Sequence, residues 1–112
     1  STVEGELAGE ATPMTALLAS FPPGSITGAP KLRAIELIAE LEQTPRGPYT
    51  GAMFYESPGG QLDSNVLIRT ASIVGNMARY GTGGAIVADS DPEAEHDEAL
   101  IKAQPFVEAM GS

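Results

Sequence analysis

The sequence contains no cysteine and no tryptophan, and only six of its 112 residues are lysine or arginine. Without cysteine, the chain has no disulfide framework and no thiolate metal site, which suits a cytoplasmic protein. Fifteen acidic residues outweigh the basic ones and give a net charge of −9 at pH 7. This charge argues against binding to nucleic acid phosphates or to an anionic lipid surface. We therefore expect no nucleic acid partner.

Long apolar stretches are also missing from the chain. No run approaches the roughly 20 apolar residues that cross a bilayer. Residues 1–6 lack the basic and apolar regions of a signal peptide. We expect a soluble protein with no membrane segment. A chain of 112 residues has room for only one modest core.

Three segments have the pattern of helices. The first starts at Thr12, is followed by a proline at the first helical position, and stops before residues 22–24, Pro-Pro-Gly. The second is expected over residues 27–41, where apolar side chains recur at helical spacing. The last is expected over residues 91–109, with a kink or an end at Pro105.

Between the second and third helices the composition changes to β-branched and aromatic residues. Strands are expected over residues 49–56, 62–74 and 77–88, joined by turns at Ser-Pro-Gly-Gly and Gly-Asn. Consecutive strands with short turns pair antiparallel. The sequence therefore predicts an α+β fold, in which helices flank an antiparallel three-stranded meander.

A sheet of three strands needs another layer to cover it. Residues 85–88, Ala-Ile-Val-Ala, are apolar at successive positions, as expected for a strand buried on both faces. The predicted helices cannot easily supply that much cover. We expect either a portion of a larger fold or a chain that self-associates through its exposed sheet edges.

The acidic segment at the start of the last helix is the strongest candidate for chemistry. Ser90 is expected to cap the helix, with Glu93 completing a capping box. Glu95, Glu98 and Lys102 are then neighbours on one face, a plausible seat for Mg²⁺ and an anionic ligand. The alternative is a solvated acidic first turn, which the helix dipole also favours. On spacing alone this ordinary alternative is preferred.

Two glycine-containing segments do not match nucleotide-binding fingerprints. Residues 81–85, Gly-Thr-Gly-Gly-Ala, lack the third glycine and the following helix of a dinucleotide site. They can instead let a ligand approach backbone N–H groups, or form a bulge or a tight crossing. Residues 24–31, GSITGAPK, lack phosphate-loop spacing and lead into a helix start that could receive an anion or simply be capped.

Arg69 interrupts an otherwise apolar strand. An unpaired buried guanidinium is costly, so this side chain needs a carboxylate or an anionic ligand. Tyr49 could join it across the sheet to hold such a ligand. Internal pairing of Arg69 with Asp63 or Asp89 is the competing interpretation.

Several of these segments, taken in order, resemble one enzyme family. They are Phe-Pro-Pro before GSITGAPK, then Ile-Arg-Thr at residues 68–70, then GGAIVADSDPEAE and Glu98. Together they are similar to the C-terminal part of the chorismate-utilising, or chorismate-binding, enzymes. The resemblance covers residues 1–112 and implies the C-terminal portion of a larger chorismate-binding α/β sandwich, without its N-terminal portion.

Within that family, GSITGAPK is most similar to the aminodeoxychorismate synthase component I branch. The resemblance implies Mg²⁺-dependent amination of chorismate at C4 on the folate, or para-aminobenzoate, pathway. A glutamine amidotransferase partner would supply the ammonia. Anthranilate synthase component I, of tryptophan biosynthesis, is the alternative, and a non-catalytic self-associating module is another. The resemblance also implies that this chain alone is inactive.

The resemblance assigns roles to three residues of the acidic helix. Glu98 corresponds to a Mg²⁺ ligand, and Glu95 to the acidic residue that supports the metal or its waters. Lys102 corresponds to a lysine near the ring carboxylate. Glu95 and Lys102 are the expected catalytic residues.

Four further residues correspond to the family's substrate-binding positions. Tyr49 and Arg69 match the pair that holds the second carboxylate of chorismate. Gly83 and Gly84 match the backbone that lies against it.

Overall fold

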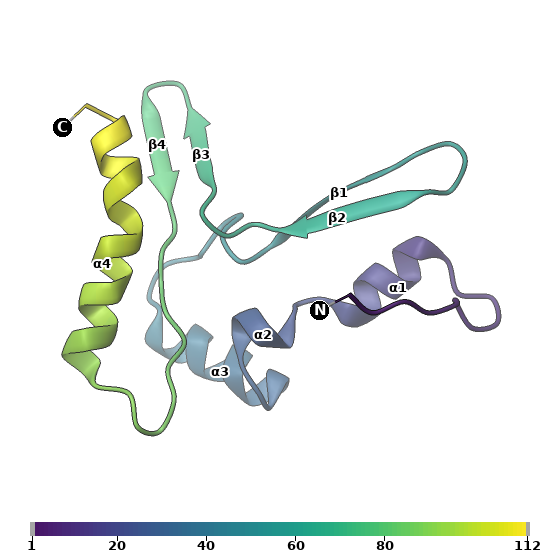
Figure 1. The fold of residues 1–112 in the computed structure, drawn as a ribbon, viewed down its shortest axis with the longest axis horizontal. Coiled ribbons are helices and arrows are strands. Elements are labelled where there is room, and N and C mark those ends of the chain that lie inside the picture. Colours follow the sequence, from purple (N-terminus) through teal and green to yellow (C-terminus); the bar gives the residue numbers. More distant parts are fainter. Residues whose placement is uncertain (1, 112) are drawn as a thin grey trace. The chain divides into compact units, whose positions relative to one another are not determined.

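The computed structural model describes residues 2–111 (Figure 1). The described chain divides into two compact units. One comprises the chain up to Gln43 with Ala52–Val66, and the other comprises Thr44–Gly51 with the chain from Leu67 onward. The elements, in chain order, are α1 (Pro13–Ser20), α2 (Gly24–Thr27), α3 (Lys31–Leu41), β1 (Ala52–Glu56), β2 (Leu62–Val66), β3 (Ala71–Val74), β4 (Met77–Tyr80) and α4 (Pro92–Ala109).

Helix α1 begins where the sequence predicted. The Thr12 hydroxyl accepts a hydrogen bond from the Thr15 backbone N–H at 3.2 Å, and the Thr15 hydroxyl accepts one from the Thr12 N–H at 2.8 Å. Each hydroxyl thus satisfies an N–H group that the first helical turn would leave without a partner. Pro13 stands at the first helical position, where its missing N–H costs nothing.

The second predicted helix starts later than expected. A short helix, α2, ends at Gly28, whose φ of 120° interrupts the helical path, and α3 begins only at Lys31. Pro30 is the residue that precedes α3, with extended backbone angles, rather than a residue of its first turn. The prediction of one continuous helix over residues 27–41 was therefore wrong at its N-terminal end.

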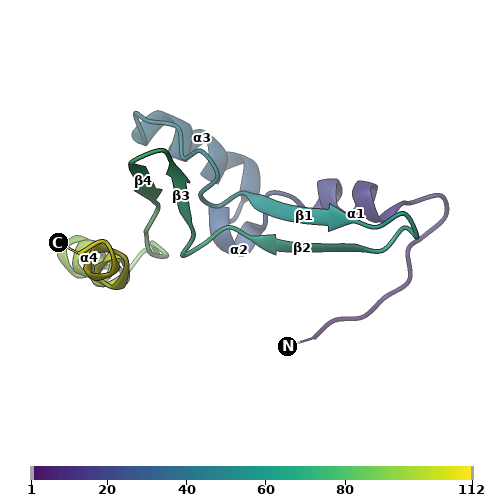
Figure 2. The same cartoon turned by 90° about the horizontal axis from the view of Figure 1, so that it is seen from above.

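Strands β1 and β2 form an antiparallel hairpin whose register pairs Ala52 with Val66 and Glu56 with Leu62 (Figure 2). The turn between them is closed by a hydrogen bond of 2.9 Å from the Gly60 N–H to the Ser57 carbonyl. Gly60 has a φ of 79°, a left-handed conformation that glycine adopts without steric cost. The Ser-Pro-Gly-Gly turn is thus confirmed.

The predicted three-stranded meander is replaced by two separate two-stranded antiparallel sheets, β1–β2 and β3–β4. The expected strand over residues 62–74 is broken at Arg69, whose φ of 50° cannot continue a pleated strand. Leu67, just before the break, instead exchanges backbone hydrogen bonds with Thr50 and Gly51, each 2.9 Å long. The α+β class and the antiparallel pairing of neighbouring strands are confirmed.

The last predicted strand is shorter than expected. Regular pairing stops at Tyr80, and residues 81–88 form no strand. Ile86 and Val87 are 74% and 66% exposed, so neither face of this segment is covered within the described chain. The expectation that residues 85–88 are buried on both faces is not met here.

Helix α4 is capped by Asp91, one residue after the predicted cap. The Asp91 carboxylate accepts a hydrogen bond of 2.9 Å from the Ala94 N–H. This makes the predicted capping box of Ser90 and Glu93 wrong, and it releases the Ser90 side chain for another contact. Pro105 lies inside the helix, which continues beyond it to Ala109.

Within the second unit, helix α4 runs beside β4 (Figure 1) and contacts it through one pair of aromatic rings. The rings of Tyr80, on β4, and Phe106, on α4, are stacked with centroids 4.6 Å apart and planes 9° from parallel.

Leu67, at 8% exposure, is the one buried hydrophobic residue in the part of the chain that the structure describes. No helix among these residues is long and apolar enough to cross a membrane.

Candidate functional site

The acidic face predicted for α4 is present in the structure. Glu98 and Lys102, one turn apart, form an ion pair between Glu98 Oε1 and Lys102 Nζ. The same Nζ donates a hydrogen bond of 3.3 Å to the Gly83 carbonyl. Lys102 therefore joins the helix to the glycine segment that the sequence singled out.

Glu95 and Glu98 converge on Gly84. An ideal Cβ placed on Gly84 would lie 2.8 Å from Glu95 Oε2 and 3.6 Å from Glu98 Oε1. The missing side chain thus leaves room for the Glu95 carboxylate beside the backbone, while the Glu98 carboxylate lies at ordinary contact distance from the same position. The other oxygen of Glu95, Oε1, accepts a hydrogen bond of 2.6 Å from the Ser90 hydroxyl.

The glycine segment is held along the helix by a further contact. The Thr82 hydroxyl donates a hydrogen bond of 2.9 Å to the Ala99 carbonyl of α4. With the Lys102 contact to Gly83, this bond fixes two successive residues of the segment against one helix face. The backbone beside the carboxylates is therefore anchored by side chains of both elements.

Tyr49 lies against the same glycine segment. A Cβ on Gly81 would come within 2.2 to 2.6 Å of three carbon atoms of the Tyr49 ring, which shows how closely the ring covers this backbone. The Tyr49 hydroxyl lies 3.1 Å from the position of a Cβ on Gly83. The guanidinium of Arg46 lies 5.7 Å from the centre of the ring, within cation–π range.

Arg69 is the one predicted site residue that no contact among residues 2–111 joins to this cluster. It stands at the break between β2 and β3, is exposed, and makes no hydrogen bond or ion pair with residues 2–111. The pairing with Asp63 or Asp89 considered from the sequence is therefore not observed. The other six predicted residues, Tyr49, Gly83, Gly84, Glu95, Glu98 and Lys102, are connected as described above.

The cluster offers two carboxylates to a metal ion. Among residues 2–111, no group of three or more histidine, cysteine, aspartate or glutamate side chains is placed to hold a metal. Mg²⁺ keeps several waters and is commonly held by one or two protein carboxylates plus oxygens of the substrate. Glu95 and Glu98 fit such an ion as a partial ligand set.

Sequence reasoning missed three residues that shape this cluster. Thr82 has no pattern that signals its contact, because the bond joins it to Ala99, 17 positions away. Arg46 lies only three positions before Tyr49, and its contact with that ring was not considered. Ser90 was noticed, but as a helix cap. Asp91, the next residue, can also cap the helix, and it does so in the structure. The presence of this second candidate cap was the signal that Ser90 could make another contact.

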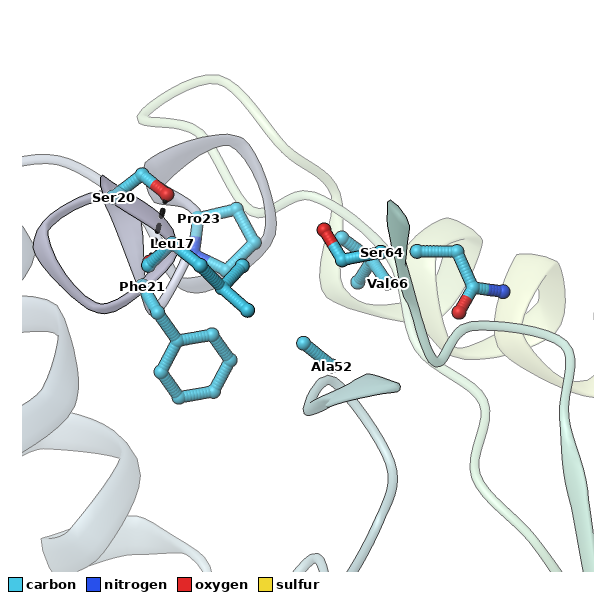
Figure 3. A pocket seen from close by; sticks show the side chains of 8 residues that line it. Leu17, Ser20, Phe21, Pro23, Ala52, Ser64 and Val66 are labelled. Carbon is cyan, nitrogen blue, oxygen red and sulfur yellow. Dashed lines mark hydrogen bonds between the residues drawn. The ribbon is translucent and has the colours of Figure 1, made fainter. Parts of the chain in front are cut away.

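A hollow lies within the first unit, between the end of α1 and the β1–β2 hairpin (Figure 3). Its volume is about 210 Å³, and its walls are mostly apolar. The Ser20 hydroxyl, at its edge, donates a hydrogen bond of 2.9 Å to the Leu17 carbonyl. No charged side chain lines this hollow, so it is unsuited to an anionic ligand. The lining residues are Leu17, Ser20, Phe21, Pro23, Ala52, Ser64, Asn65 and Val66.

Two carboxylates and a lysine thus lie beside an open glycine backbone in this α+β chain. Comparison with known families shows where the chain belongs. The family described as chorismate binding enzyme matches residues 1–108, and the chain belongs to this family.

Three relatives show how much of the chain the similarity covers. An aminodeoxychorismate synthase of Streptomyces griseus is 44% identical over 110 residues, which are 98% of this chain and 15% of the relative. A probable chloroplastic aminodeoxychorismate synthase of Oryza sativa subsp. japonica is 45% identical over 104 residues, 93% of this chain and 12% of the relative. Anthranilate synthase component 1 of Acetivibrio thermocellus is 44% identical over 110 residues, which are 98% of this chain and 22% of the relative. The chain therefore spans less than a quarter of the length of these relatives.

Proposed function

We propose that this chain is the C-terminal portion of an aminodeoxychorismate synthase component I. The complete enzyme would aminate chorismate at C4, using ammonia from a glutamine amidotransferase partner. The observation that carries the proposal is the convergence of Glu95 and Glu98 beside Gly84, with Lys102 bonded to the same segment. Family membership and the relatives named aminodeoxychorismate synthase support it.

Chorismate carries two carboxylates, so the site needs fixed donors and cations. Lys102 Nζ would pair with the ring carboxylate. The Tyr49 hydroxyl, with the backbone of Gly83 and Gly84, would hold the second carboxylate. Arg69, from the break between β2 and β3, would join Tyr49 there in the complete fold. Donors fixed before the substrate arrives stabilise a shifting charge without reorganising during the reaction.

Glu95 and Glu98 would hold Mg²⁺ together with water and substrate oxygens. When bound, the ion supplies a Lewis acid and a template for the substrate. Since Mg²⁺ normally draws on several well-placed oxygens, two carboxylates form only part of such a site. We therefore propose that this chain is inactive by itself and contributes half of the complete site.

Two alternatives have specific support. A relative named anthranilate synthase component 1 is 44% identical, which equals the identity to the Streptomyces griseus relative, so amination at C2 is the second candidate. The exposed apolar residues of the described chain favour a third, a non-catalytic module that self-associates. Size that rises with concentration in sedimentation experiments would support this module.

Calorimetric titration of chorismate into the chain, with Mg²⁺ present, tests the proposal. We expect binding heat that requires Mg²⁺ and is lost in Glu98→Gln. Glu93→Gln, in the first turn of the same helix and outside the cluster, is the matched control and should bind as the unchanged chain does. Heat that persists in Glu98→Gln or without Mg²⁺ would contradict the assigned metal site.

A further inference from the structure

We propose that Ser90 is a positioning residue, which holds the Glu95 carboxylate in the orientation that faces Gly84. Ser90 donates its hydroxyl proton to Glu95 Oε1 at 2.6 Å. The same hydroxyl accepts a hydrogen bond of 3.1 Å from the Val87 backbone N–H. This role rests on the proposed function of Glu95 as part of a magnesium site.

The two hydrogen bonds fix the direction of the Ser90 hydroxyl. A hydroxyl has one proton to donate and lone pairs that accept. Because the Val87 N–H is directed at a lone pair, the single proton remains for Glu95. A hydroxyl bonded to a carboxylate oxygen is a charge-assisted contact and is stronger than a neutral one.

The contact restrains the whole carboxylate of Glu95. With Oε1 bound to Ser90, the second oxygen, Oε2, is the one beside Gly84, 2.8 Å from the position of its missing Cβ. Groups that orient a metal ligand typically contribute roughly 10-fold to 100-fold in metal affinity. Ser90 can therefore influence Mg²⁺ binding without touching the ion.

The helix does not depend on Ser90 for its start. Asp91 is the residue whose side chain caps α4, through its hydrogen bond with the Ala94 N–H. Removing the Ser90 hydroxyl should therefore leave α4 formed. This separates a positioning role from a purely structural one.

The test compares Ser90→Ala with Ser90→Thr, which keeps a hydroxyl, in the full 112-residue chain. Ser72→Ala, on β3 of the same unit, is the matched control, because its hydroxyl makes no hydrogen bond in the described chain. NMR couplings report the rotamer of the Glu95 side chain without metal, and amide shifts of Gly84 and Glu98 report Mg²⁺ binding. Amide resonances of α4 report whether the helix persists.

We expect a fixed Glu95 rotamer in the unchanged chain, in Ser90→Thr and in Ser72→Ala, and rotamer averaging in Ser90→Ala. The Mg²⁺ dissociation constant should rise roughly 10-fold in Ser90→Ala alone. A rotamer that is unchanged in Ser90→Ala, or already averaged in the unchanged chain, would overturn the inference. Loss of α4 in Ser90→Ala would also overturn it, because Ser90 would then be structural.

The same experiment separates this inference from the proposed function. If Ser90 fixes the Glu95 rotamer but Mg²⁺ moves no resonance at Gly84 or Glu98, the magnesium site fails. The positioning contact itself then stands.

Discussion

At Gly84, a single hydrogen atom stands where any other residue would place a Cβ beside two carboxylates. In Gly84→Ala, the new methyl would lie 2.8 Å from Glu95 Oε2. The carboxylate would have to turn away, since that distance is too short for a real contact. We expect Mg²⁺ affinity to fall roughly tenfold, as when the orientation of metal ligands is disturbed. Calorimetric titration of Mg²⁺ measures the change.

The Gly84→Ala effect should be confined to binding, because a glutamate carboxylate is the movable end of a flexible side chain. The free energy of unfolding should change by about 0.5 kcal/mol or less. Gly5→Ala is the control, because no atom lies within 4 Å of its Cβ position. Equal Mg²⁺ affinity in the two variants would show that the carboxylates do not converge at Gly84 in solution.

Gly81 is constrained by the Tyr49 ring rather than by a flexible side chain. In Gly81→Ala, the methyl would meet ring carbons at 2.2 to 2.6 Å. Overpacking of this kind costs about 1–3 kcal/mol. In a Tyr49→Ala background the ring is absent, and the same substitution should cost much less. Denaturant unfolding of the unchanged chain, the two single variants and the double variant measures this coupling. If the two losses in free energy of unfolding add within about 0.5 kcal/mol, the contact is refuted.

Tyr55 and Asp63 face each other across the β1–β2 hairpin. Asp63 raises the pKa of Tyr55 above 10.0, first by accepting a hydrogen bond from the phenol and second by its negative charge. The protonated phenol is thus favoured in the folded hairpin. The contribution of the Tyr55–Asp63 pair to stability is fully present below pH 10.0. It is lost as the pH rises through the pKa that Tyr55 has in the folded chain.

Asp63→Asn should therefore lower the pKa of Tyr55 towards 10.0. NMR titration of the Tyr55 ring carbons follows this change. Asp89→Asn, in the other unit, removes an equal charge and should leave the Tyr55 pKa where it was. A Tyr55 titration that Asp63→Asn does not alter would exclude the pair.

Among the elements, β4 and α4 are joined by the stacked rings of Tyr80 and Phe106. Aromatic pairs contribute about 0.5–1.5 kcal/mol beyond the area they bury. Tyr80→Leu and Phe106→Leu keep apolar side chains but remove the stacking. In the double-mutant cycle we expect a coupling of about that size, measured by denaturant unfolding. Additive costs would show that the two rings pack independently.

The helices were more predictable from the sequence than the strands. Thr12 and Pro13 carry their own start signal, and the structure begins α1 there. The break at Arg69 carries none, since arginine has no preference for a φ of 50°. That break depends on the bonds of Leu67 to Thr50 and Gly51, which link distant segments. Local patterns therefore located most of the elements, but not the short helix α2, the end of β4 at Tyr80 or the division into two hairpins.

The candidate site was predictable where helical spacing decides which side chains meet. Glu98 and Lys102 are four residues apart and form the expected pair. The approach of Tyr49 to Gly81 could not be derived in this way, because it joins segments 32 positions apart. The sequence analysis paired Tyr49 with Arg69 around a ligand and did not predict its contact with Gly81. The contact of Ser90 with Glu95 was missed because a stronger local rule, helix capping, offered Ser90 another role.

At the scale of the whole molecule, apolar side chains are poorly covered. Leu67 is the one buried hydrophobic residue within the described range, while Ile86, Val87 and Ile73 are each at least 66% exposed. A stable domain normally buries such residues, each worth about 1.5–3 kcal/mol when fully buried. The exposed faces are consistent with the proposal that other parts of a longer protein cover them.

Ile86 provides a test of this proposal. In the isolated chain, Ile86→Ala should change the free energy of unfolding by about 0.5 kcal/mol or less, because the side chain is 74% exposed. In a chimera, these 112 residues would replace the matching segment of the Streptomyces griseus relative. There the same substitution should cost about 2–5 kcal/mol, as for a buried isoleucine.

Denaturant unfolding of the isolated chain and of the chimera, each with and without Ile86→Ala, measures the two losses in free energy of unfolding. Gly5→Ala, with open space around its Cβ position, is the control in each background. A small cost of Ile86→Ala in the chimera as well would mean that the longer protein does not cover residues 85–88. Sedimentation of the isolated chain would then decide whether a second copy does, since self-association through these residues should weaken in Ile86→Ala.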